Sequence, residues 1–305
     1  MLLKEQNYGV EIELTGITRK AAAQVIANYY GTSISHTGGS YDTYTTTDRK
    51  GRTWKAMSDA SISTTHKVNG VQVSAGRDYS CEVVTPILQY EDIEDLQQII
   101  RNLVSKGAVS NSSCGIHVHV DGANHTPQSL TRLLNFAIGR QDLFYEALNI
   151  GDRANRWCHK ISKTLLKAMK NDTEKNKHSM EAIWYSKAND DYCGGIDHQH
   201  YNSTRYHGIN LHAFFTKGTV EFRLFNGTTH AGKIKAYIQF CLAMSAWAIE
   251  APDKMYYKSC TNYTPEQKKT LMMNVLTRRL GMTGVEFKTA RLHLTSAFAE
   301  NEAAA

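Results

Sequence analysis

Runs of alternating apolar and polar residues recur along this chain of 305 residues. Alternation with a period of two is typical of a β-strand that buries one face. The apolar positions of each run would enter a core, and the polar positions would share the opposite face. The four runs and their polar pairs are 8–14 with Glu11 and Glu13, 114–120 with His117 and His119, 206–214 with Asn210 and His212, and 219–225 with Glu221 and Arg223.

Two turn signals indicate that neighbouring strands pair antiparallel. Asn69-Gly70 lies between two short β-forming runs and strongly predicts a hairpin. Thr216-Lys217-Gly218 is a short link that would join the third and fourth alternating runs in a second hairpin. Residues 32–75 are rich in Thr, Ser, Tyr and Gly, and we interpret them as antiparallel strands and loops.

Helical periodicity fills much of the remaining chain. Thr18 precedes a run of good helix formers that Gly31 would end, and residues 91–106 carry an amphipathic stripe with acids in the first turn. The polar residues 189–204 are interpreted as a surface loop or a lid over a site, because a zinc site would lack a fourth ligand. The three candidate ligands of such a zinc site are Cys193, His198 and His200. Elsewhere in the chain, further helices are predicted at about 127–148, 158–170, 173–187, 233–250, 264–280 and 284–299.

The composition is that of an ordinary globular protein. Hydrophobic residues make up 41% and charged residues 21%, and the net charge of +6 is mostly dispersed. The densest basic stretch, 153–177, is typical of a solvated helix face, and no nucleic-acid-binding motif accompanies it. Six cysteines without a C-x-x-C pair fit reduced thiols. Since no apolar run has bilayer length and no signal-peptide core is present, the sequence predicts a cytoplasmic protein that binds no membrane.

The polar faces of the alternating runs carry groups that bind metal ions. Glu11 and Glu13 would lie about 7 Å apart, from the rise per residue of a strand, and would repel each other without a cation. On this run alone, a divalent metal site and a solvated edge strand are equally good interpretations. Glu82 is more informative, because it is an acid within an otherwise apolar run and would be costly to bury without a partner or a metal. His117 and His119 would project from one face, a common metal-binding arrangement.

Two shorter motifs have weaker implications. Gly227-Thr-Thr-His-Ala-Gly-Lys233-Ile is similar to a phosphate-binding loop, but Ile234 replaces the hydroxyl that would hold Mg²⁺. Lys233 would still lie near a helix start, where it could contact an anion. Asp59 and Ser61 lie two positions apart in a stretch that, on local grounds, is interpreted as a turn.

Six segments carry these motifs, in this order along the chain: Gly9–Glu13, Trp54–Ile62, Glu82–Pro86, Cys114–Val120, Arg205–Leu211 and Glu221–Thr228. Together they resemble the amidoligase family, which belongs to the superfamily of glutamine synthetase and glutamate–cysteine ligase. The resemblance covers roughly residues 7–250. It implies an α+β fold in which a curved antiparallel β-sheet lines the active site and helices pack on its outer face.

The resemblance also implies an activity, the ATP-dependent joining of a carboxylate to an amine through an acyl phosphate. ATP and Mg²⁺ (or Mn²⁺) would be the cofactors. By resemblance, Glu13 and Glu82 hold one ion. The resemblance also implies that Glu11, His117 and Glu221 would hold a second ion, which would bridge the phosphates.

The resemblance implies further roles around the phosphates. Arg223 would stabilise the transferred phosphoryl group, a task suited to a rigid and always charged guanidinium. Arg205 and Asn210 would contact phosphate or the substrate carboxylate, and His119 would contact the nucleotide. Asp59 would orient or deprotonate the incoming amine.

Two other classes of function could use the same residues. A metal-dependent hydrolase would bind zinc with the Glu and His side chains and would need no nucleotide. A non-catalytic module would bind a partner such as nucleic acid through residues 153–177, and it would tolerate Glu11→Gln and Glu221→Gln. Carboxylates outnumber histidines on the polar faces and an arginine joins them, which favours the ligase. Its partners would be a carboxylate and an amine, such as a peptide or an amino-acid derivative.

The length of the chain allows one large domain or two moderate ones. Residues 1–255 are predicted to form one catalytic domain with a helical insertion at about 125–204. Residues 256–305 are predicted to form a C-terminal helical extension that packs on the same domain.

Overall fold

The computed structural model describes residues 3–191, 194–252 and 263–298 of the chain. The chain forms two compact units. We call residues 7–118 and 225–237 the strand-rich unit, and residues 1–6, 119–224 and 238–305 the helical unit.

The strand-rich unit holds most of the strands. Its elements are β1 (Tyr8–Leu14), α1 (Arg19–Tyr30), β2 (Ser35–Gly38), β3 (Thr43–Thr47), β4 (Thr53–Met57), β5 (Thr65–Val68), β6 (Val71–Ser74), β7 (Cys81–Val84), α2 (Ile93–Ser105) and most of β8 (Gly115–Asp121). β1 pairs antiparallel with β7, β7 with β4, and β4 with β3. The helix α1 packs against β3, β4 and β7 and also touches α2.

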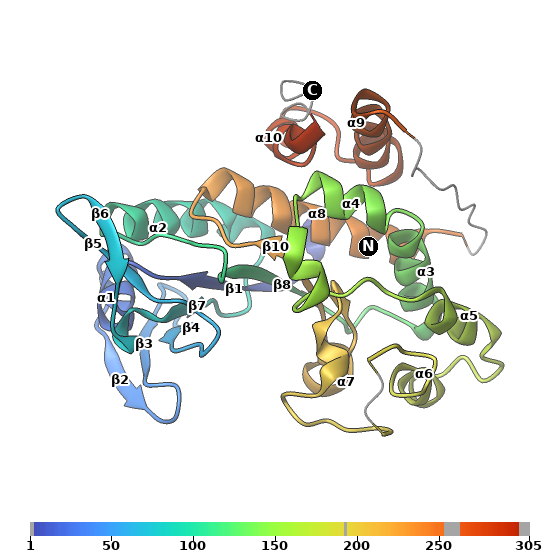
Figure 1. Cartoon of the computed structure of the whole chain (residues 1–305), viewed down its shortest axis with the longest axis horizontal. Helices are drawn as coiled ribbons and strands as arrows, with labels where there is room; N and C mark the ends of the chain where they lie inside the picture. The colour runs from blue at the N-terminus through green and yellow to red at the C-terminus, as the bar shows by residue number, and fades with distance from the viewer. Residues whose placement is uncertain (1–2, 192–193, 253–262, 299–305) are drawn as a thin grey trace. The chain divides into compact units, whose positions relative to one another are not determined.

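The helical unit holds a row of helices beside a short strand pair. β9 pairs antiparallel with β10. The helix α3 packs against α5, and α5 packs against α6 (Figure 1). Its elements are η1 (Leu3–Glu5), the end of β8, α3 (Pro127–Ile138), α4 (Gln141–Ala147), α5 (Lys163–Asn171), α6 (Lys177–Trp184), η5 (Ser203–Tyr206), β9 (Ile209–Asn210), α7 (His212–Lys217), most of β10 (Thr219–Asn226), most of α8 (Ala231–Glu250), α9 (Pro265–Asn274) and α10 (Lys288–His293).

The strands form a large antiparallel sheet. Its eight strands follow the order β2-β3-β4-β7-β1-β8-β10-β9, and β5 and β6 make a separate pair. With its many helices, the fold is α+β, as the resemblance implies.

The first predicted strand and helix are both confirmed. The apolar residues of β1 are buried, as the alternation predicts. The hydroxyl of Thr18 accepts a hydrogen bond from the backbone N–H of Ala21, and Gly31 ends the helix with a left-handed φ of 72°. The helix α1 that follows β1 is therefore capped at both ends and belongs to the same unit as β1.

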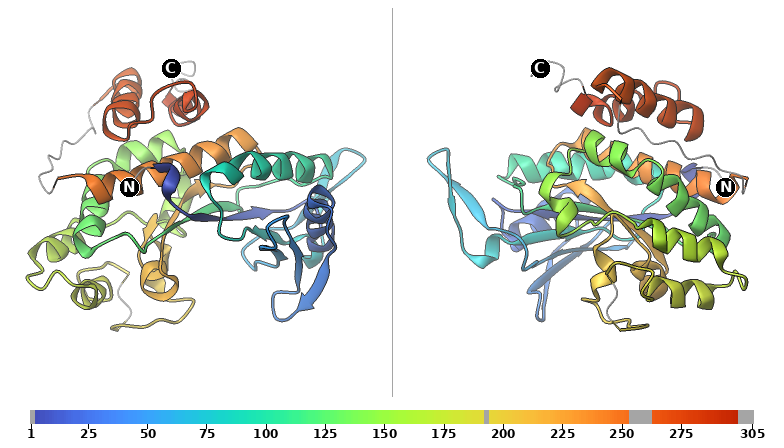
Figure 2. Two further views of the ribbon diagram at one scale, coloured as in Figure 1. Left: turned by 180° about the vertical axis from the view of Figure 1, so that it is seen from behind. Right: turned by 45° about the vertical axis from the view of Figure 1, so that its right-hand side comes forward.

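The hairpin predicted at Asn69-Gly70 is also confirmed. These residues have φ of 50° and 82°, which suits a type I′ turn between β5 and β6. The hairpin projects from the rest of the strand-rich unit (Figure 2). Two of its valines are well exposed, Val68 at 46% and Val71 at 64%.

The strand predicted at 206–214 is wrong over most of its length. Only β9 pairs with β10, and the chain then turns into α7 instead of a tight hairpin. The Oδ1 of Asn210 accepts a hydrogen bond at 2.8 Å from the backbone N–H of His212, the first residue of α7, and such a local bond favours a turn over a continued strand. Gly218 ends α7 with φ of 76°. His212 therefore does not share the strand face of Asn210, and its Nδ1 bonds the hydroxyl of Tyr185 at 2.5 Å.

Several predicted helices are shorter than their apolar periodicity indicates. The helix predicted at 127–148 is broken into α3 and α4 at Gly139-Arg140, where glycine is a poor helix former. Residues 158–162 precede α5, and His159 forms a parallel bridge with His207 instead of entering a helix. The remaining predicted helices are confirmed with shifted ends as α2, α6, α8, α9, the short π-helix η6 (Val275–Arg279) and α10.

The predicted domain boundary at 255/256 lies outside the described residues, and that division stays a prediction. The helical insertion predicted at about 125–204 contains α3, α4, α5 and α6. Among the described residues, no helix combines the length and the apolar character that crossing a membrane requires.

A buried histidine makes the stability of the helical unit dependent on pH. Both ring nitrogens of His125 are hydrogen-bonded, to the hydroxyls of Ser129 at 3.0 Å and Ser245 at 2.8 Å. Burial lowers the pKa of His125 to about 4. The unfolded chain, with an ordinary histidine pKa, binds the proton more readily. We therefore expect the free energy of unfolding to fall as the pH drops below the ordinary value toward 4, by about 3 kcal/mol for this residue.

Urea unfolding at pH 7 and pH 5 measures this effect. The difference between the two free energies of unfolding should be smaller in His125→Gln than in the wild type, because the glutamine does not titrate. An equal difference in both proteins would show that His125 does not take up the proton.

Candidate functional site

Three side chains of the strand-rich unit meet across neighbouring strands. Glu13 on β1 lies directly opposite Glu82 on β7 in the antiparallel register. His117 comes from β8, the strand on the other side of β1. One ligand atom from each residue lies within 4.8 Å of the other two. We call these three residues the Glu13 group.

Burial makes the negative charge of the Glu13 group costly unless a cation compensates it. Glu13, Glu82 and His117 are only 4, 9 and 3% exposed. Like charges opposite each other destabilise a strand pair, and buried carboxylates require partners. One such partner is the backbone N–H of Gly115, which donates to Glu13 Oε2 at 2.6 Å. Two carboxylates and an imidazole also form a donor set that suits a divalent cation such as Mg²⁺ or Mn²⁺.

Glu11 fixes the orientation of His117. Because a carboxylate can only accept, the Nδ1–H of His117 donates to Glu11 Oε2, at 3.0 Å. In the neutral imidazole the lone pair then lies on Nε2, which is 3.7 Å from Glu13 Oε1. Carboxylates commonly fix the tautomer of metal-binding histidines in this way. The two contacts also place Glu11 and Glu13 on one face of β1, as the alternation predicts.

A second polar group lies on β9 and β10 of the helical unit. Arg223 Nη1 donates to Glu221 Oε1 at 2.6 Å, and Asn210 Nδ2 donates to Glu221 Oε2 at 2.7 Å. Asn210 is opposite Glu221 in the register, and all three side chains are buried. We call them the Arg223 group. Both oxygens of the Glu221 carboxylate are thus held by donors from two strands.

Aromatic and backbone groups fix the guanidinium of Arg223 further. Its Nε donates to the carbonyl of Trp157 at 3.4 Å, and its central carbon lies 5.9 Å from the ring centre of Tyr206. His119 also lies near Glu221, with its Nε2 3.9 Å from Oε1. The Nδ1 of His119 is hydrogen-bonded to the hydroxyl of Thr219 at 2.9 Å. A buried guanidinium with a fixed orientation suits the binding of an anion.

The other predicted site residues have local roles in the structure. Arg205, in η5, donates through Nη1 to the carbonyl of His200 at 2.9 Å and is half-buried. Lys233 lies in the first turn of α8, and its side chain is half-buried. The carboxylate of Asp59 accepts from the backbone N–H of Ser61 at 2.6 Å, as the turn interpretation predicts. Their functional roles stay predictions.

One implied ligand set stays a prediction, and a zinc set at 189–204 is already disfavoured by the sequence. The second metal set, with Glu11, His117 and Glu221, draws on both units. In the zinc alternative, Cys193 lies outside the described residues, while His198 Nε2 pairs with Glu181 Oε1 at 2.6 Å.

Sequence reasoning missed three groups that position the site. The backbone N–H of Gly115, the carbonyl of Trp157 and the hydroxyl of Thr219 hold Glu13, Arg223 and His119. Backbone groups leave no signal in a residue pattern. Thr219 does begin the fourth alternating run, which is the one sequence feature that could have indicated it.

Most of the chain matches a known protein family. Residues 4–245 match a family described as "putative amidoligase enzyme". The chain belongs to this amidoligase family. The match confirms the resemblance drawn from the six motifs, and it supports a ligase activity for this amidoligase-family protein. No curated protein matches the chain.

Proposed function

We propose that this amidoligase-family protein is an ATP-dependent ligase that joins a carboxylate to an amine through an acyl phosphate. The observation that carries the proposal is the Glu13 group, in which two buried carboxylates and one imidazole have the spacing of metal ligands. A divalent ion held there would neutralise charge on the phosphates of ATP. Because oxygen ligands outnumber nitrogen, we propose Mg²⁺ or Mn²⁺ rather than zinc.

In this proposal, Arg223 stabilises the phosphoryl group during transfer. A carboxylate oxygen of the acid attacks the terminal phosphorus of ATP, and ADP leaves. The amine nitrogen then attacks the acyl carbon, and inorganic phosphate leaves. The guanidinium is suited to the first step because it is always charged and already oriented by Glu221 and Trp157.

The remaining predicted residues take supporting roles. We assign phosphate or substrate-carboxylate contacts to Arg205 and Asn210, and nucleotide contacts to His119 and Lys233. Asp59 would orient the amine. The acid and the amine would be amino acids, their derivatives or peptides.

The proposal is tested by binding and by trapping. Isothermal titration of the protein with ATP should give binding heat in the presence of Mg²⁺ or Mn²⁺ and little heat in the presence of a chelator. Incubation with ATP, Mg²⁺, hydroxylamine and a panel of amino acids and dipeptides should yield ADP and a hydroxamate. Hydroxylamine intercepts an acyl phosphate without requiring the natural amine.

Two results would contradict the ligase. Absence of nucleotide binding with either ion would remove its main support. Hydrolysis of amides or esters that requires zinc, proceeds without ATP and is lost in Glu13→Gln would favour the metal-dependent hydrolase instead.

A further inference from the structure

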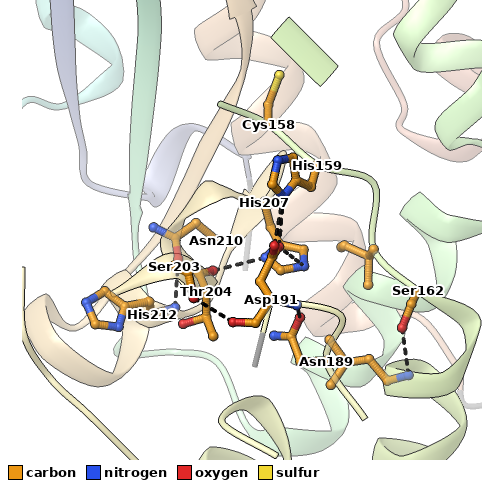
Figure 3. Close-up of polar contacts among 12 residues, drawn as sticks. Cys158, His159, Ser162, Asn189, Asp191, Ser203, Thr204, His207, Asn210 and His212 are labelled. Carbon is orange, nitrogen blue, oxygen red and sulfur yellow. Dashed lines mark hydrogen bonds and ion pairs between the residues drawn. The ribbon is translucent and has the colours of Figure 1, made fainter. Parts of the chain in front are cut away.

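Outside the groups described above, one carboxylate of the helical unit lies between two imidazoles (Figure 3). Asp191 contacts the Nδ1 of His159, with its Oδ2 at 2.9 Å and its Oδ1 at 3.0 Å. The same Oδ2 lies 3.4 Å from the Nε2 of His207. The three residues come from separate segments of the chain, and sequence reasoning assigned none of them a role.

The hydrogen bonds fix which nitrogen of each ring carries a proton. The Nδ1–H of His207 donates to the carbonyl of Thr204 at 3.0 Å. His207 is fully buried, and burial lowers its pKa, which favours the neutral ring. The Nδ1–H of His159 donates to Asp191, which leaves its lone pair on Nε2. The side chain of His159 is 31% exposed, so His159 is the imidazole that a substrate can reach.

Two other roles for these side chains fit less well. In the part of the chain that the structure describes, His159, Asp191 and His207 do not converge as a group of metal ligands would. Burial raises the pKa of the neighbouring Cys158 thiol to about 11, which keeps it protonated at neutral pH. A metal centre and a cysteine nucleophile are therefore both disfavoured.

A short ladder of backbone hydrogen bonds connects His159 to Arg223. The N–H of Arg223 donates to the carbonyl of Gly208 at 2.9 Å, and the N–H of Gly208 donates to the carbonyl of His159 at 3.0 Å. Two strand spacings separate the backbones of His159 and Arg223 by about 10 Å. The backbones of His159 and Arg223 are thus within the length of a small substrate of each other.

We propose that His159, positioned by Asp191, is the general base that deprotonates the amine substrate. This inference rests on the proposed ligase function. The incoming ammonium gives one proton to Nε2 of His159, and the resulting imidazolium is stabilised by the carboxylate of Asp191. The amine lone pair then forms the C–N bond as the C–O bond to phosphate breaks. The second proton of the nitrogen leaves with inorganic phosphate as HPO₄²⁻.

The proposal is tested with two nucleophiles of equal size, hydroxylamine and methylamine. The acid is any that gives a hydroxamate in the trapping experiment. At pH 7 hydroxylamine is mostly unprotonated, whereas methylamine is almost entirely protonated. In His159→Gln we expect methylamide formation to fall by about 10²-fold or more, while hydroxamate formation stays within a few-fold of the wild type. Asp191→Asn should show the same selective loss to a smaller extent, as expected of a positioning residue.

His36→Gln is the matched control, because His36 also bonds a carboxylate, that of Asp42, at 2.7 Å but lies in the strand-rich unit. It should leave both rates unchanged. Equal losses with both nucleophiles in His159→Gln, or no loss with either, would overturn the general base. A wild type that makes hydroxamate but no methylamide would also overturn it, whereas a wild type that makes no hydroxamate would contradict the ligase itself.

Discussion

Glu82→Gln is expected to stabilise the metal-free protein while removing its response to metal and nucleotide. Glu82 and Glu13 face each other at a buried position of the sheet, so neutralising one carboxylate relieves repulsion worth about 1 kcal/mol. The melting temperature without metal should therefore rise by roughly 2–4 °C. The rise in melting temperature produced by Mn²⁺ with ATP should disappear, and hydroxamate formation should fall by at least about 100-fold.

Differential scanning calorimetry with a chelator, with Mn²⁺, and with Mn²⁺ and ATP measures these shifts. Glu91→Gln serves as the control, since the Glu91 side chain is 71% exposed and removing its charge should change neither property. A Glu82→Gln variant that melts lower than the wild type without metal, or that keeps its full response to Mn²⁺, would contradict the metal-binding role.

Replacement of Arg223 is expected to cost both activity and stability, and a double variant separates the two. Arg223→Met should reduce hydroxamate formation by about 10³-fold, as loss of a phosphoryl-stabilising arginine does elsewhere. It would also leave the buried Glu221 without its cation, which should lower the free energy of unfolding by about 3–5 kcal/mol.

In Arg223→Met/Glu221→Gln the uncompensated charge is absent, so most of the stability should return while activity stays low. Arg223→Lys keeps the charge without the planar fork and should fall between wild type and Arg223→Met in activity. Urea unfolding and the trapping assay measure the two properties separately. If the double variant recovered activity along with stability, the role of Arg223 would be structural only.

The sequence patterns predict single elements well where one local rule decides the structure. The period of two fixes the faces of β1, and Glu11 and Glu13 do share one of them. Asn69-Gly70 specifies its own turn, and Thr18 and Gly31 bound α1. These features depend on neighbours a few residues away, so they can be inferred from the chain alone.

Long-range register and side-chain capping were not predictable in this way. The alternation of β1 does not reveal that Glu13 lies opposite Glu82, because that depends on how β7 aligns with it. Asn210 supports a strand by pattern, yet its side chain bonds the backbone N–H of the first residue of α7. Asp191 and His159 are 32 positions apart and meet only through the folded backbone. The six motifs in order therefore predict the family better than they predict the geometry of the site.

The path of the chain between the two units determines how the folding of each unit can be tested separately. The backbone passes from one unit to the other at 6/7, 118/119, 224/225 and 237/238, and the last three junctions fall inside β8, β10 and α8. Shortening the gene from either end therefore never isolates a complete unit. Circular permutation, or co-expression of complementary fragments, is the appropriate way to ask whether either half folds by itself.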